Sequence, residues 1–261
     1  MESPDEQIRL ELKTDTEQVR RQALWCGVRK GMKLLDAGCG PGIVTSVLGS
    51  ITKDKIVGVD YSQETIAYAR DNYTDEGQFE FVLHDLRDEL PFADSFDLVW
   101  ARFVLEYNKA SVAEIVRNLS NVLKPGGILC LLDLDNNCLA HHPLPSRLEK
   151  ALHRVMSFLE VKYDFDPYVG RKLYSLMYDA GFEEIKVDMM PHHLIYGNVS
   201  GADLFNWTKK VEMVLRKAPF VIEKDYPDGA QGFLEDFEKF FGDPRRFTYT
   251  PLIMCKGVKP L

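Results

Sequence analysis

The chain has 261 residues, of which 45% are apolar and 28% charged, and 40 acidic side chains against 32 basic ones give a formal charge of −8. This acidic balance, without a block of Lys or Arg, argues against a nucleic-acid partner. No apolar stretch is long enough to span a bilayer, and no signal-peptide core opens the sequence. Five cysteines without a Cys-x-x-Cys pair argue against a disulfide framework or a zinc site. We therefore expect a cytoplasmic globular protein.

Capping residues and helically spaced apolar side chains predict helices in the first half of the chain, at residues 14–26, 62–73 and 111–123. Between the helices lie β-branched and aliphatic runs typical of strands buried on both faces of a parallel sheet, at residues 33–36, 56–60, 79–83, 96–100 and 127–132. This alternation is typical of βαβ units. It predicts a doubly wound α/β fold.

The second half adds helices to this pattern. Helices are predicted at 146–159 and 169–180, followed by a strand at 184–189, two aromatic-rich helical faces at 204–215 and 233–241, and a last strand at 247–256. No repeat or interdomain linker is visible. We expect a single domain, 1–261, with a core formed by 30–137, 169–190 and 246–258 and helical insertions at about 138–168 and 194–245.

A glycine-rich loop is the most informative segment. Residues 34–42, LLDAGCGPG, run from a buried strand into Gly38, Gly40 and Gly42, and a helix begins near Ile43. Glycines there permit a tight turn and a close approach of ligand to the backbone. Asp60 ends the next strand, where a carboxylate can accept bonds from both hydroxyls of an adenosine ribose.

Two other interpretations of the loop were weighed. A dinucleotide site, and with it an NAD-dependent oxidoreductase, requires G-x-G-x-x-G/A, but position 43 is Ile. Asp36 lies two residues before the first glycine, where a carboxylate would repel a pyrophosphate and favour an ammonium or sulfonium ligand. The other interpretation is a tight turn that binds nothing.

Residues 32–133 resemble the cofactor-binding core of class I S-adenosylmethionine (SAM)-dependent methyltransferases, most closely the branch with the ubiquinone, menaquinone and sterol methyltransferases. The matching motifs are LLDAGCGPG (34–42), VGVDYS (57–62), HDLRDELPFADSFDLVWARFVLEY (84–107) and LKPGG (123–127), in the family's order and spacing. The resemblance implies a Rossmann-like sheet of seven mostly parallel strands, the last antiparallel, with helical lid insertions. It implies SAM as cofactor.

The resemblance also assigns roles to residues around the methionine part of SAM. Gly38, Gly40 and Gly42 would lie against it, and Asp36 would orient the loop and the amino group. Arg102, within the stretch 101–103 after the fourth strand, would line the same side. The alternative for Arg102 is a structural role, reaching a carboxylate such as that of Glu106.

At the adenosine end, Asp60 would bind the ribose and Tyr61 would pack near the adenine. Asp85 would accept a bond from the adenine N6 amino group, and Leu86 would contribute backbone contacts. The alternative for Asp85 is a local role in capping the turn.

Methyl transfer from a sulfonium is an in-line displacement that mainly needs positioning and exclusion of water, with a base only for an acceptor of high pKa. His141, His142 and His193, which follow the last strands of the predicted sheet, are the candidates for such a base; the alternative is that they are polar loop or wall residues. Asp133–Asn137 resembles a magnesium-binding strand end, but Arg102 would oppose a cation, so we expect no metal.

The sequence therefore favours a SAM-dependent methyltransferase acting on a small hydrophobic or aromatic metabolite, with an O-, N- or C-acceptor all open. The alternatives are a non-catalytic SAM-binding protein and the NAD-dependent oxidoreductase. The aromatic-rich insertions suggest a lid over an apolar pocket. They are also consistent with packing of the lid itself or with a homodimer surface.

Overall fold

The computed structural model describes residues 11, 14–73, 77–217 and 219–261. The chain divides into two compact units. Unit 1 comprises the described residues of Met1–Asp133, Gly170–Asp188 and Ile253–Leu261, and unit 2 comprises those of Leu134–Val169 and Met189–Leu252. These segments lie close to the predicted core and insertions, and the single domain of 1–261 stays a prediction.

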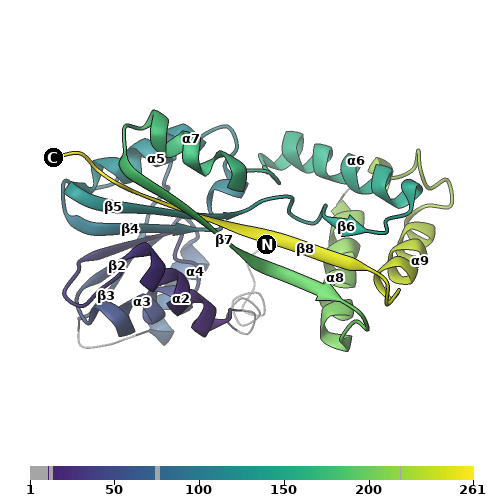
Figure 1. The fold of residues 1–261 in the computed structure, drawn as a ribbon, viewed down its shortest axis with the longest axis horizontal. Helices are drawn as coiled ribbons and strands as arrows, with labels where there is room; N and C mark the ends of the chain where they lie inside the picture. The colour runs from purple at the N-terminus through teal and green to yellow at the C-terminus, as the bar shows by residue number, and fades with distance from the viewer. Residues whose placement is uncertain (1–10, 12–13, 74–76, 218) are drawn as a thin grey trace. The chain divides into compact units, whose positions relative to one another are not determined.

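Unit 1 contains the parallel strands that the βαβ pattern predicts (Figure 1). They are β1 (Leu34–Ala37), β2 (Ile56–Asp60), β3 (Phe79–Leu83), β4 (Phe96–Arg102) and most of β5 (Leu123–Leu134). Its helices are α2 (Thr16–Cys26), α3 (Ile43–Thr52), α4 (Gln63–Asn72), α5 (Val112–Asn121) and α7 (Leu173–Asp179), with single 3-10 turns at Leu105–Tyr107 and Gly170–Lys172. Figure 1 shows α5 and α7 on one face of the sheet and α2, α3 and α4 on the other.

The sheet has the order β3-β2-β1-β4-β5-β8-β6, and β7 (Glu183–Tyr196) pairs with β8 (Phe247–Val258). Leu34 in β1 stands opposite Ile56 in β2 and Leu98 in β4, both in parallel register. The short strand β6 (His141–His142) is antiparallel to β8. The predicted mostly parallel Rossmann-like fold is confirmed. The described sheet has eight strands rather than the seven expected, because it includes β6, which the sequence did not predict.

Local chemistry explains where the helices of unit 1 begin. The carboxylate of Asp15 accepts a 2.9 Å bond from the N–H of Gln18, so α2 starts after Asp15, later than predicted. The hydroxyl of Ser62 caps α4 in the predicted way, accepting from the N–H of Thr65 at 3.2 Å. All four residues of β1 are buried, as expected of a central parallel strand covered on both faces.

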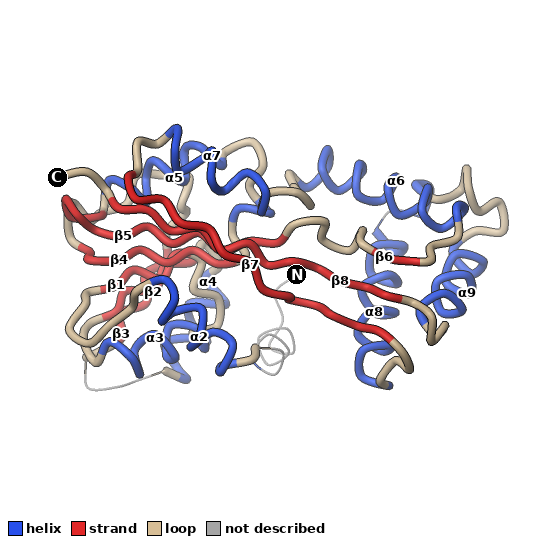
Figure 2. Tube along the Cα trace, viewed as in Figure 1, coloured by secondary structure: helices blue, strands red, loops and turns tan. Residues whose placement is uncertain are grey.

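Unit 2 contains β6, α6 (Ser146–Tyr163), α8 (Gly201–Lys217), α9 (Ala230–Phe241), a 3-10 turn at Pro219–Val221 and the adjoining parts of β7 and β8 (Figure 2). It has its own core of aliphatic and aromatic side chains, in which Phe233, Phe237 and Phe241 are buried. The guanidinium of Arg246 is buried here and donates to the carbonyls of Phe241 and Ile195 at 3.0 and 2.6 Å. Many aromatics of the predicted insertions therefore pack within unit 2.

Candidate functional site

The glycine loop leaves β1 at Ala37 and is tied to β2. The N–H groups of Gly38 and Cys39 both donate to the carbonyl of Val59, at 2.8 and 3.0 Å. Gly38 has a φ of +75°, and a Cβ there would collide with a methyl of Val104. Gly40 has a φ of +54°, yet a Cβ there would meet no atom within 4 Å. Packing therefore requires glycine at 38, whereas the space beside Gly40 is open to a ligand.

Asp60, at the end of β2, lies directly against this loop. Its Oδ2 accepts a bond from the N–H of Gly40 at 3.0 Å, and its Oδ1 accepts from the N–H of Ser62 at 3.0 Å. The two bonds fix the plane of the carboxylate. Because each carboxylate oxygen can accept more than one hydrogen bond, Asp60 can also receive hydroxyl donors from a ligand.

Asp36 lies in β1, just below the loop, and is 2% exposed. Burial raises the pKa of its carboxyl to about 7, while a 2.7 Å bond from the hydroxyl of Thr45 and the charge of Arg102 favour the ionised form. The charge of Asp60 opposes it. Asp36 thus titrates near neutral pH, where a bound cation would hold it ionised.

Arg102 is the last residue of β4 and lies close to the carboxylate of Asp36. Its guanidinium stacks on the ring of Phe103 with a carbon-to-centroid distance of 4.0 Å. Burial lowers its pKa to about 10, so it stays charged at neutral pH, and Asp36 and Asp133 are the carboxylates that stabilise that charge. Its Nε is buried and has no hydrogen-bond partner among the described residues. An orphaned N–H of this kind is a donor available to a ligand.

The residues predicted at the adenosine end differ in their surroundings. Tyr61 is 72% exposed, so most of its side chain is accessible to a planar group. Leu86 is buried and its carbonyl accepts from the side chain of Asn118 at 3.0 Å. Asp85 is paired with Arg87, whose Nε lies 2.9 and 3.0 Å from the two carboxylate oxygens and which lowers the pKa of that carboxyl. Any adenine amino group would share Asp85 with Arg87.

The family model described as a methyltransferase domain matches residues 35–131. An uncharacterized methyltransferase of Synechocystis sp. is 31% identical over 161 residues, which cover 61% of this chain and 70% of that protein. This chain belongs to the class I SAM-dependent methyltransferase family. The predictions of the family and of SAM as its cofactor are confirmed.

Other similar proteins agree with this membership. The ubiquinone/menaquinone biosynthesis C-methyltransferase UbiE of Vibrio parahaemolyticus is 29% identical over 176 residues, covering 61% of this chain and 68% of that protein. A phosphoethanolamine N-methyltransferase 2 from Haemonchus contortus, solved with phosphomonomethylethanolamine and S-adenosylhomocysteine, shares the fold with a TM-score of 0.58 and 18% identity, over 94% of this chain and 53% of that one. The chain spans 39% to 70% of the length of the curated relatives that it matches first.

The donors and acceptors around the glycine loop fit the chemistry of SAM. The open side of Gly40 offers space, Asp60 offers acceptors suited to a ribose diol, and Asp36 is a carboxylate whose ionised form a cationic ligand stabilises. The orphaned Nε of Arg102 suits a carboxylate. The roles of these residues toward the methyltransferase cofactor are proposals that the chemistry of the site supports.

The three histidines weighed as bases all lie in unit 2, two of them in β6 and one in β7. His141 Nδ1 is 2.9 Å from the hydroxyl of Thr248, and Nε2 is 3.1 Å from the carbonyl of Cys138. Since a carbonyl only accepts, Nε2 carries the proton and Nδ1 accepts from Thr248. Burial lowers the pKa of His141 to about 4. Both nitrogens are therefore occupied in a neutral ring, a structural arrangement.

The other two histidines have different environments. His142 is exposed, and His193 is half-buried with Nδ1 3.3 Å from the hydroxyl of Thr250 and its ring against Trp207. A role as base stays a prediction for each of the three. In the described part of the chain, no cluster of three His, Cys, Asp or Glu side chains could hold a metal ion. Nor is any helix there long and apolar enough to cross a membrane.

Sequence reasoning missed several residues that pack around the glycine loop and its neighbours Asp36 and Arg102. Thr45 is buried in the first turn of α3 and bonds Asp36; a polar residue on the buried face of that helix was the available signal. Val104 packs against Gly38, and Phe103 carries the guanidinium of Arg102. These two lie in a loop whose conformation, with a φ of +59° at Phe103, has no clear sequence pattern.

Proposed function

We propose that this chain transfers the methyl group of SAM to a small, apolar metabolite. The observation that carries the proposal is the hydrogen bond that joins Asp60 to Gly40, since it holds a carboxylate beside the open face of the glycine loop, which supports a role in accepting from a ribose diol. When bound, SAM supplies a methyl group on a positively charged sulfur that departs as a neutral thioether. The chain's task is to bind and orient SAM and the acceptor, and to exclude water.

Each candidate residue around the glycine loop has a defined part in this proposal. Ionised Asp36 compensates the positive charge at the methionine end, and Arg102 directs its buried Nε to the carboxylate. Asp60 holds the two ribose hydroxyls and Tyr61 covers the adenine. Asp85 accepts from the adenine amino group while keeping its pair with Arg87.

The composition of unit 2 supports an apolar acceptor. Its interior is built of aliphatic and aromatic side chains. His141 uses both of its nitrogens within unit 2, so it would have to give up a hydrogen bond to act as a base. This favours acceptors that react without deprotonation by that residue, such as an amine or an activated carbon.

The test is formation of product. Purified protein is incubated with SAM and a panel of small apolar amines, phenols, acids and quinols, and S-adenosylhomocysteine is measured by mass spectrometry. Turnover in one class, absent in Asp60→Ala, is the expected result. Binding of SAM without turnover across the panel would instead favour the non-catalytic SAM-binding protein.

We also infer that the chain works in the cytoplasm. We further infer that it has no nucleic-acid partner, because its formal charge of −8 would repel a phosphate backbone. A homodimer is the other arrangement that the sequence suggests. Sedimentation analysis tests the homodimer, and a DNA- and RNA-binding assay at low salt tests the absence of a nucleic-acid partner. Tight binding of either nucleic acid would contradict that absence.

A further inference from the structure

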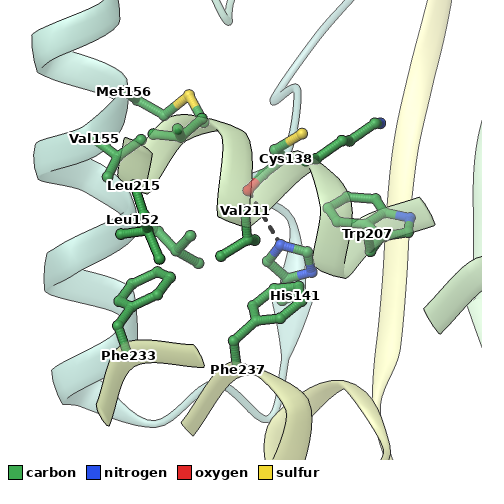
Figure 3. Close-up of a pocket in the computed structure, with 12 residues that line it drawn as sticks. Cys138, His141, Leu152, Val155, Met156, Trp207, Val211, Leu215, Phe233 and Phe237 are labelled. Carbon is green, nitrogen blue, oxygen red and sulfur yellow. Dashed lines mark hydrogen bonds between the residues drawn. The ribbon is translucent and has the colours of Figure 1, made fainter. Parts of the chain in front are cut away.

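Unit 2 encloses an apolar cavity of about 50 Å³ between α6, α8, α9 and the segment before and within β6 (Figure 3). Its wall is formed largely by aliphatic and aromatic side chains, among them Leu152 of α6, Val211 of α8 and Phe233 of α9. Figure 3 shows these side chains pointing toward one another, with the ring of His141 closing one side. The cavity is half-open to the surface of unit 2. A water occupies roughly 10–15 Å³ by this measure, so the cavity admits a hydrocarbon segment of a few carbons.

One charged residue lines this cavity, Lys210 of α8, and it does so with the hydrocarbon stem of its side chain. Lys210 is half-buried, and its Nζ lies 4.8 Å from the centroid of the Trp207 ring, which is 4% exposed. Within the described part of the chain, Lys210 forms no ion pair with a carboxylate. A partly desolvated ammonium with only an aromatic face beside it gains from an anionic partner.

The polar groups next to Lys210 do not supply that partner. His141 is neutral, and its nitrogens are taken by Thr248 and the Cys138 carbonyl. The cavity wall is thus apolar, and Lys210 is the one cationic residue among its described lining residues. That combination complements a molecule with an apolar end and an anionic group.

We propose that this cavity binds the apolar end of a small amphipathic anion, of the carboxylate class, whose charged group contacts Lys210. The inference goes beyond the proposed function, since it assigns a ligand to unit 2 whether or not that ligand is the methyl acceptor. Binding itself needs only unit 2, so it can be measured without SAM.

The preceding residue provides a matched control. Lys209 is on the same helix, and its Nζ also lies over an aromatic ring, 5.6 Å from the centroid of Phe205. Lys209, however, is exposed, forms a 2.7 Å ion pair with Glu212 and does not line the cavity. Replacing Lys209 therefore removes a positive charge from the same helix without removing a residue that lines the cavity.

Calorimetry on the full chain tests the proposal with hexanoate, its neutral counterpart 1-hexanol, and the cation hexylammonium. We expect hexanoate to bind about tenfold more tightly than 1-hexanol, and hexylammonium most weakly, as a partly desolvated ion pair requires. Lys210→Met removes the preference for hexanoate and leaves binding of 1-hexanol within about twofold, because the apolar stem is kept. Lys209→Met changes neither. Val211→Phe, which fills the cavity, weakens both ligands.

Three results would overturn the proposal: no binding of hexanoate, equal binding of hexanoate and 1-hexanol, or equal losses in the two lysine variants. Thermal unfolding of each variant reports whether it folds. Titration of the same preparations with S-adenosylhomocysteine reports the glycine loop separately. If that ligand binds and hexanoate does not, the carboxylate site is wrong and the proposed function stands; the reverse result contradicts the proposed function alone.

Discussion

The N–H of Gly40 donates a 3.0 Å hydrogen bond to Oδ2 of Asp60, which joins the loop after β1 to the last residue of β2. The loop and the acid are 20 positions apart in the chain, yet each orients the other. The second oxygen of Asp60 is held by the N–H of Ser62, the residue that caps α4. A single carboxylate thus links the glycine loop, a strand end and a helix start, and its plane is set before any ligand arrives.

This arrangement predicts the effect of replacing Asp60. Asp60→Ala removes the acceptors for the ribose and releases Gly40, so we expect the Kd for SAM to rise at least about 100-fold, the loss of two charge-assisted hydrogen bonds. Calorimetric titration measures the Kd. Asp88→Ala, an exposed acid in a nearby turn, is the control and should bind as the original chain does. Unchanged affinity in Asp60→Ala would disprove the ribose placement.

The pKa of Asp36 predicts that SAM affinity depends on pH. Since that pKa is about 7 and a cationic ligand favours the ionised carboxylate, SAM must displace a proton at lower pH. We expect affinity to be constant above pH 7 and to fall about tenfold per pH unit below it. Titrations between pH 5.5 and 7.5 measure this slope. Asp36→Asn should bind weakly at every pH, and an equal slope in that variant would contradict the assignment.

The same carboxyl predicts a cost in stability. The pKa of Asp36 is raised above its unfolded value near 4, so the folded chain holds the proton more tightly between pH 4 and 7. Its contribution to the free energy of unfolding is present below pH 4 and lost as pH rises to 7, by on the order of 4 kcal/mol. Urea unfolding at pH 5 and 8 should show that Asp36→Asn stabilises unit 1 at pH 8 relative to the original chain. Equal stability of the two at pH 8 would argue that Asp36 is not desolvated.

Asp85 makes a narrower prediction because Arg87 already engages it. Asp85→Ala should weaken S-adenosylhomocysteine binding by about tenfold, less than Asp60→Ala, since one hydrogen bond to a charged acceptor contributes about 1–3 kcal/mol. The sharper measurement compares this ligand with S-inosylhomocysteine, which lacks the N6 amino group. The original chain should prefer the adenosyl ligand and Asp85→Ala should not. Arg87→Ala is the control, expected to keep the preference; retention of it in Asp85→Ala would remove Asp85 from the adenine site.

His141 predicts an acid-sensitive unit 2. Its pKa of about 4 lies below the usual value, so the unfolded chain binds the proton more readily between pH 4 and 6.5. The stabilisation is present above pH 6.5 and is lost toward pH 4, by about 3 kcal/mol. His141→Gln should flatten that dependence when unfolding of the chain in urea is followed by circular dichroism at pH 5 and 7.5, whereas exposed His142→Gln should not. Identical curves for all three proteins would contradict burial of a neutral ring.

The half of the chain that contains the glycine loop could be predicted because its signals are local. The strand before Gly38, the spacing of the glycines and the acid at 60 specify a βαβ turn within a few dozen residues. The end of β7 could not, since its strand continues from 189 to 196 only by pairing with β8, more than fifty residues later. The strand β6 is two residues long and exists only as a partner of β8.

The same distinction applies to the candidate residues. Asp36 and the three glycines were predicted from the motif at 34–42 and Asp60 from the motif at 57–62, and the structure brings Asp60 against Gly40 and close to Asp36. The pairing of Asp85 with Arg87 and the enclosed position of His141 depend on side-chain geometry and on contacts distant in sequence. A strand-end rule drew attention to His141, but the rule does not say whether an imidazole faces a ligand or a carbonyl.

The central claim is most directly tested by titrating the purified chain in parallel with SAM, S-adenosylhomocysteine and NAD⁺, after mass spectrometry of the denatured protein has shown whether a ligand was carried through purification. We predict saturable binding of both adenosyl ligands, about one per chain, and none of NAD⁺. Binding of NAD⁺ alone, or of none of the three by a ligand-free preparation, would contradict it.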